Sequence, residues 1–164
     1  MMTPAWGADW AWSVPLTVLT LAIHIVSITG IAILLTRAGT LIERWKPGPI
    51  PASLLIAAAV GGVGGSLMAL LALEAAVWAA AYLLLGAVGT VADAMLYSID
   101  SITTRGASGL ELQPHWKMMG ALEAVNGVLL FGISTAFLAS VITEARTLLG
   151  RLTGRPRTNA LPIA

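Results

Sequence analysis

Two ionisable residues lie deep within long apolar stretches of the sequence, where charged groups are rare. His24 interrupts the apolar run 11–36, and Glu74 interrupts a second run, 53–86. Such residues usually mark a functional site or face a polar partner. His24 lies 12 residues from Trp12 and Glu74 lies 12 residues from Gly86, the presumed outer ends of the two spans, which is roughly 18 Å of helix in both cases. We therefore expect the two side chains to hydrogen-bond each other, with proton or ion sensing as the alternative.

A second group of polar residues follows in one short segment. Residues 90–102 (TVADAMLYSIDSI) can form an amphipathic helix with Asp93 and Asp100 seven residues apart on one face. This helix is too short and too polar to cross a membrane. The loop directly after it is rich in hydroxyl groups and glycine and consists of Thr103, Thr104, Arg105, Gly106, Ala107, Ser108 and Gly109.

The composition excludes several classes of function. Of the 164 residues, 57% are hydrophobic and 10% are charged, whereas a soluble domain has about 25% charged residues. The net charge of +1 provides no basic surface for nucleic acid. There is no cysteine, and His24 and His115 are far apart, so we expect no metal site and no cofactor. The absence of a nucleophile–base pair argues against an enzyme.

The elements that position these residues are three predicted membrane spans in one domain, an all-α membrane fold. We expect span 1 at residues 11–36, a loop at 37–52, span 2 at 53–86, a short helix and loop at 90–113, span 3 at 115–145 and a tail at 146–164. Span 2 is too long for a straight crossing of the ~30 Å hydrocarbon core. A kink or a close helix contact is expected at its four glycines, Gly61, Gly62, Gly64 and Gly65.

The distribution of Lys and Arg predicts the orientation. None precedes span 1, three lie between spans 1 and 2, two (Arg105 and Lys117) lie between spans 2 and 3 or at the start of span 3, and four follow span 3. Because positive residues concentrate on the cytoplasmic side, the N-terminus is expected outside and the C-terminus in the cytoplasm. The first ten residues contain no Lys or Arg, unlike the start of a secretory signal, so we expect the N-terminus to be retained.

The order of apolar span, short helix, Gly/Thr loop and apolar span is typical of a re-entrant pore segment. The stretch 74–137 resembles the pore domain of small bacterial potassium-channel-like proteins of the two-helix ion-channel family. EAAVWAAAY (74–82) is similar to the outer helix of that family, AMLYS (94–98) to its pore helix and GALEAVNGVLLFG (120–132) to its inner helix. The resemblance implies a homotetramer in a bacterial inner membrane, in contact with lipid, with span 3 lining a path for monovalent cations.

The loop departs from the filter of that family, which carries two threonines, an aliphatic residue, glycine, an aromatic residue and glycine. Thr103, Thr104 and Gly106 fit this pattern, whereas an arginine, an alanine and a serine occupy the remaining positions (Arg105, Ala107 and Ser108). Losing the second glycine restricts the left-handed backbone, and losing the aromatic ring removes packing around the loop. We therefore expect conduction that is weakly selective or altered.

Arg105 has two possible roles. Four arginines around one axis would repel each other strongly, so the first interpretation is an ion-pair network with Asp100 or Glu123. The alternative is a cationic ring that blocks cations or admits anions. Thr103 and Thr104 could either line the ion path or only bond to nearby carbonyl groups.

Span 3 carries Glu123 and Asn126 as polar insertions, and two of its glycines, Gly127 and Gly132, could act as gating hinges or as points of close helix packing. The alternatives to a cation channel are a non-conducting structural or regulatory homologue and an anion pore. A transporter is disfavoured because no second half repeats the first.

Overall fold

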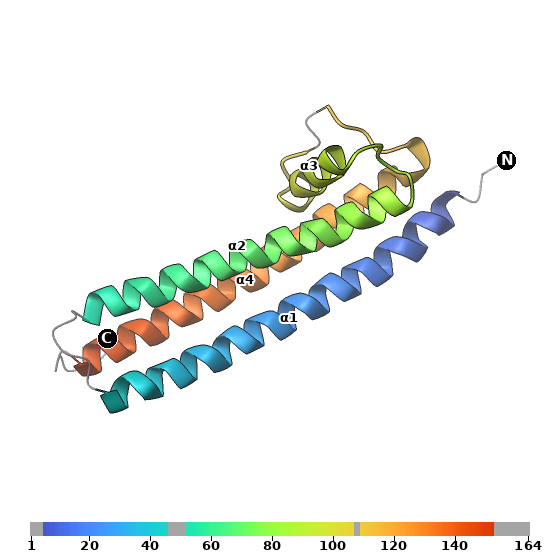
Figure 1. Cartoon of the computed structure of the whole chain (residues 1–164). Helices are drawn as coiled ribbons and strands as arrows, with labels where there is room; N and C mark the ends of the chain where they lie inside the picture. Colours follow the sequence, from blue (N-terminus) through green and yellow to red (C-terminus); the bar gives the residue numbers. More distant parts are fainter. Residues whose placement is uncertain (1–4, 46–51, 107–108, 153–164) are drawn as a thin grey trace, which may run out of the picture.

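The computed structural model describes residues 5–45, 52–106 and 109–152. Within these ranges the chain is helical and contains no strand, which confirms the predicted all-α class. The long helices are α1 (Ala5–Trp45), α2 (Ala52–Leu84) and α4 (Lys117–Leu152). The short helix α3 (Val91–Ile102) and a 3-10 turn, η1 (Pro114–Trp116), lie between α2 and α4 in the sequence (Figure 1).

Three helical segments are long and apolar enough to cross a membrane, namely Gly7–Leu41, Ile56–Leu84 and Pro114–Leu148. They indicate an integral membrane protein. α1 and α4 both extend beyond the predicted spans, to Trp45 and Leu152. Hydropathy marks where a helix leaves the lipid, and the charged residues beyond that point remain helical because no proline interrupts them before residue 47 or 156.

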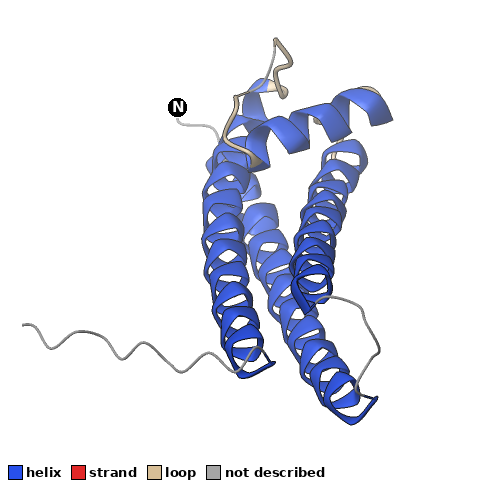
Figure 2. Cartoon of the chain, turned by 90° about the vertical axis from the view of Figure 1, so that its left-hand side faces the viewer, coloured by secondary structure: helices blue, strands red, loops and turns tan. Residues whose placement is uncertain are grey.

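The start of α1, the end of α2 and the start of α4 lie at the same end of the bundle, and α3 packs beside them (Figure 1). We call this end the α3 end. The last turn of α4 lies at the opposite end. Viewed after a quarter turn, a short helix lies across the top of the three long ones (Figure 2).

The turn between α2 and α3 forms from local signals. Gly86 adopts a left-handed φ of 65°, which glycine tolerates without a Cβ clash. Thr90 is the N-cap of α3: its hydroxyl oxygen accepts a hydrogen bond from the Asp93 backbone N–H at 3.1 Å. Asp93 also lies in the first turn of α3, where a carboxylate interacts favourably with the helix dipole.

Two clusters of buried side chains hold α3 against α2 and α4. The larger one is aromatic: the rings of Tyr82 and Tyr97 pack edge to face with centroids 5.4 Å apart, and Trp78 and Trp116 belong to the same cluster. The smaller one consists of Leu71, Ala75, Ile102 and Leu130. The core of the described chain therefore lies mainly at the α3 end.

Two glycines of α4 allow α3 to approach closely. A Cβ at Gly120 would clash with the Tyr97 ring, and a Cβ at Gly127 would clash with the backbone carbonyl of Ile102. The two contacts follow one another in the same order along α3 and along α4. Close packing, one of the two predicted roles of Gly127, is confirmed, whereas a Cβ at Gly132 would meet no other atom within 4 Å.

The close helix contact predicted as one of two alternatives at the glycines of span 2 is not made within the described chain. α2 is one unbroken helix, and a Cβ at Gly61, Gly62, Gly64 or Gly65 would meet no other atom within 4 Å. The reason is the rotation of α2, which buries Val63 and turns most of these glycines to the exterior.

Candidate functional site

The predicted contact between His24 and Glu74 is confirmed. His24 Nδ1 lies 2.9 Å from Glu74 Oε1, and both side chains are fully buried. The other ring nitrogen, Nε2, lies 3.1 Å from the Ser134 hydroxyl of α4. The pair therefore connects all three long helices, and Ser134 is a partner that the sequence did not indicate.

A second polar contact joins α1 to α4 nearer the α3 end. The Asn126 side-chain amide donates to the Thr20 hydroxyl at 2.8 Å, and both residues are buried. Thr20 in turn donates to the Leu16 carbonyl at 2.9 Å. The sequence marks Asn126 as a polar insertion of span 3, whereas Thr20 was not singled out. The signal that could have identified Thr20 is its spacing of four residues from His24, which places both on one face of α1.

Glu123 is held by α2 and α3 and has no ion pair with Arg105. Tyr82 Oη donates to Glu123 Oε2 at 2.6 Å. The Ser98 hydroxyl lies in hydrogen-bond contact with the other carboxyl oxygen and 2.7 Å from the Ala75 carbonyl oxygen. The single hydroxyl proton of Ser98 serves one of these acceptors at a time. Glu123 therefore fastens the middle of α3 to α2 and α4.

Arg105 is paired with Asp100, the first of its two predicted partners. Its Nη2 lies 2.5 Å from Asp100 Oδ1, and its backbone N–H donates to the Asp100 carbonyl at 2.9 Å. The Asp100 side chain is 1% exposed and that of Arg105 is 61% exposed. The positive charge of Arg105 is thus balanced within the same chain by a buried carboxylate.

We expect Arg105→Leu to destabilise the protein more than Asp100→Asn does. The first change leaves a buried carboxylate without its cation, whereas the second leaves a guanidinium that water already reaches. The loss for Arg105→Leu should be about 1–3 kcal/mol, and the double variant should lose less than the sum of the single variants. Thermal unfolding of the detergent-solubilised protein measures the stability of the two single variants and of the double variant. If the losses of the single variants add up in the double variant, the pairing is contradicted.

The loop after α3 starts with two threonines, Thr103 and Thr104, which differ in their contacts and backbone conformation. The Thr103 hydroxyl donates to the Ile99 carbonyl at 2.6 Å, so it caps the helix. Thr104 has a left-handed φ of 56° and is exposed. Gly106 and Gly109 also have left-handed φ values, both 83°. Ala107 and Ser108 lie outside the described residues.

The return from the loop to α4 is anchored on the turn before α3. The Gln113 backbone N–H donates to the Ala87 carbonyl at 3.3 Å. The preceding residue, Leu112, is buried. Lys117 donates to Glu111 at 2.7 Å. This hydrogen bond and the nearby ammonium charge hold the pKa of Glu111 below its ordinary value.

Across the residues that the structure describes, no group of three His, Cys, Asp or Glu side chains could hold a metal ion. No protein-family model, curated protein or solved structure matches the chain.

Proposed function

We propose that the chain is the subunit of a tetrameric, channel-like membrane protein in which α3 and the loop after it form a re-entrant pore segment. The observation that carries this proposal is the position of Ile102, the last residue of α3. It packs against Leu71 and Leu130, each 13 residues from the α3-end terminus of its helix, or about 20 Å of helix. Such a depth suits a pore segment that enters the membrane and returns to the same side.

The electrostatics of this segment favour a cation over an anion. The C-terminal end of α3 carries the negative end of its helix dipole. Asp100 in the last turn adds a carboxylate, and its ion pair with Arg105 offsets the nearby positive charge. The conducted species that we propose is a monovalent cation, with the weak selectivity expected from the non-standard filter sequence.

The exposed face of α4 suits the wall of such a path. Val125, Val128 and Gly132 lie on one stripe of the helix and are exposed in the single subunit. In a tetramer this stripe would face the central axis, where an apolar lining can gate a pore by excluding water.

The proposed location is a bacterial inner membrane, with the α3 end of the bundle outside. The Lys and Arg residues of loop 37–52 and of the tail support this orientation, because positive residues concentrate on the cytoplasmic side.

Planar bilayers containing the purified protein test conduction directly. Under a KCl gradient we expect currents whose reversal potential lies close to the equilibrium potential of K⁺. Val128→Trp, which adds bulk on the proposed pore face, should reduce the current strongly. The matched control Val26→Trp, at a lipid-facing valine of α1 with 71% exposure, should not.

Two other results would overturn the cation pore. A reversal potential near that of chloride, lost in Arg105→Leu, would indicate a cationic ring. The Arg105 side chain is 61% exposed, which is compatible with such a ring. Silence from protein that is folded and inserted would indicate a non-conducting structural or regulatory homologue.

A further inference from the structure

One carboxyl group at the α3 end is surrounded by hydroxyl groups and not by cations. Glu123 is fully buried where α2, α3 and α4 meet. The ion pairs found among the described residues join other groups, namely Asp100 with Arg105, Glu111 with Lys117 and Glu74 with His24. A buried carboxylate without a cation is strongly unfavourable, whereas a neutral carboxylic acid with hydrogen-bond partners is not.

The oxygen contacts around Glu123 outnumber the hydroxyl protons that serve them. Tyr82 Oη lies 2.6 Å from Glu123 Oε2. Ser98 Oγ contacts Glu123 Oε1 and also lies 2.7 Å from the Ala75 carbonyl oxygen. These are three oxygen–oxygen contacts at hydrogen-bond distance, and each needs one hydrogen. Tyr82 and Ser98 provide one hydrogen each, so one hydrogen is missing.

A proton on Glu123 supplies the missing hydrogen. In the neutral acid, Oε1–H donates to Ser98 Oγ, the Ser98 hydroxyl donates to the Ala75 carbonyl, and Tyr82 donates to Oε2. With an ionised carboxylate, one of the two Ser98 contacts would bring oxygen atoms together with no hydrogen between them. Ser101 also lies near enough to interact with Glu123, but its hydroxyl has only its own proton and relieves neither Ser98 contact.

We propose that Glu123 is protonated in the folded protein and is a pH-sensitive contact that holds α3 against α2 and α4. Its proton completes a chain of hydrogen bonds from Tyr82 of α2 through Glu123 of α4 and Ser98 of α3 to the Ala75 carbonyl of α2. In alkaline medium the proton leaves to hydroxide during a transient opening of α3, which gives water and a carboxylate. The carboxylate opposes reclosing, because it would be buried without a cation.

The ionisable groups that face Glu123 come from α2 and α3. Tyr82 of α2 donates to it, and Tyr97 of α3 lies near enough to interact with it electrostatically. A phenol ordinarily keeps its proton up to about pH 10, so neither tyrosine brings a charge at neutral pH. Asp100 of α3 is turned toward Arg105. Glu123 is therefore the group at this site whose charge changes first as the pH rises.

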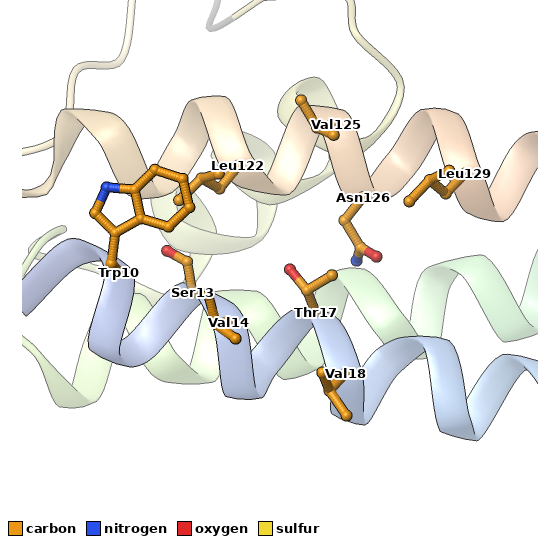
Figure 3. A pocket seen from close by; sticks show the side chains of 9 residues that line it. All are labelled: Trp10, Ser13, Val14, Thr17, Val18, Leu122, Val125, Asn126 and Leu129. Atoms are coloured by element: carbon orange, nitrogen blue, oxygen red, sulfur yellow. The ribbon is translucent and has the colours of Figure 1, made fainter.

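The elements on the other side of α4 contribute no ionisable partner to Glu123. The side of α4 that faces α1 carries apolar residues and Asn126, and the opposite part of α1, from Trp10 to Val18, contains no ionisable side chain (Figure 3). At the end of the bundle, the remaining charged groups interact in pairs, Asp9 with His115 and Lys117 with Glu111.

Infrared spectroscopy of the protein in lipid vesicles tests whether Glu123 is protonated. The C=O stretching band of a carboxylic acid is distinct from the bands of a carboxylate, and the wild-type spectrum minus that of Glu123→Gln isolates this residue. At neutral pH we expect an acid band that is absent in Glu123→Gln and kept in Glu111→Gln, the matched control at a carboxylate with 76% exposure. A difference spectrum without the acid band would overturn the proposal.

Hydrogen exchange of the α3 amides at neutral and alkaline pH tests whether the proton holds α3. Glutamine imitates the neutral acid, because its amide N–H donates to Ser98 while its oxygen accepts from Tyr82. After correction for the chemical exchange rate, the wild-type amides should exchange about tenfold faster in alkaline medium, the change expected from losing one hydrogen bond. Glu111→Gln should show the same increase, and Glu123→Gln should show none. A wild type without the increase, or an equal increase in Glu123→Gln, would overturn the proposal.

Tyr82→Phe replaces Glu123→Gln in the infrared experiment if the glutamine variant does not fold. It removes the hydrogen bond to Glu123 Oε2, so the acid band should move to higher frequency, and an unchanged band would overturn the proposal. Neither measurement involves an ion current, so the outcome is independent of whether the protein conducts.

Discussion

Replacing either His24 or Glu74 with leucine should lower the free energy of unfolding by about 3–5 kcal/mol, whereas replacing both should cost much less than the sum. Both side chains are fully buried, and their nitrogen and oxygen atoms lie 2.9 Å apart. Removing one partner leaves the other polar group in an apolar environment. Removing both substitutes two apolar side chains of moderate size for a polar pair.

Thermal unfolding of the protein in lipid-containing micelles measures this double-mutant cycle. Thr29→Leu is the control on α1, because Thr29 is exposed and its hydroxyl bonds only to the Ile25 carbonyl in the same helix, as far as the described residues show. It should change stability by less than about 0.5 kcal/mol. Losses that add up in the double variant would mean that the two residues do not interact.

The contact between His24 and Glu74 could be predicted because depth in a membrane can be read from a sequence. Both residues lie in long apolar runs, and equal distances from the run ends place them at the same level. Ser134 could not be predicted as their third partner, since the choice among several hydroxyl residues of α4 depends on how that helix is rotated. Hydropathy carries little information on rotation when a helix is apolar on nearly all sides.

The partners of Arg105 and Glu123 also show that local contacts can be predicted from the sequence, whereas contacts that depend on helix rotation cannot. Asp100 precedes Arg105 by five residues at the end of one helix, so local geometry brings them together and the pair was predictable. Glu123 was the second candidate, but its partners are Tyr82 and Ser98. Those contacts depend on the side of α4 that α3 approaches, which is determined by where Gly120 and Gly127 leave space.

The burial of Ser13 and Thr20 in α1 was also missed, because serine and threonine in an apolar run are easily counted as ordinary membrane-helix residues. Their hydroxyl groups often bond to carbonyls in the same helix, as Thr29 does. Only the packing of α1 on α4 distinguishes Ser13 and Thr20 from Thr29. The loop residues Ala107 and Ser108 stay predictions, since they lie outside the described residues.

Gly127→Ala should lower the free energy of unfolding by about 1–3 kcal/mol, the usual range for excess volume in a packed core. The added methyl group would clash with the backbone carbonyl of Ile102, and backbone cannot move aside as a side chain can. The matched control is Gly132→Ala, five residues further along α4, where a Cβ meets no other atom within 4 Å. That change should be neutral or stabilise by up to about 1 kcal/mol, because alanine favours helix over glycine.

The comparison of these two variants tests the depth of α3 independently of any ion current. If the end of α3 lies against Gly127, only the first variant loses stability in thermal unfolding, and it should also disturb the segment that follows Ile102. Introducing Ile102→Ala together with Gly127→Ala should not restore stability, since the clash involves the backbone carbonyl and not the side chain. Equal stability of Gly127→Ala and Gly132→Ala would place α3 away from this level of α4 and would remove the support for a re-entrant pore segment.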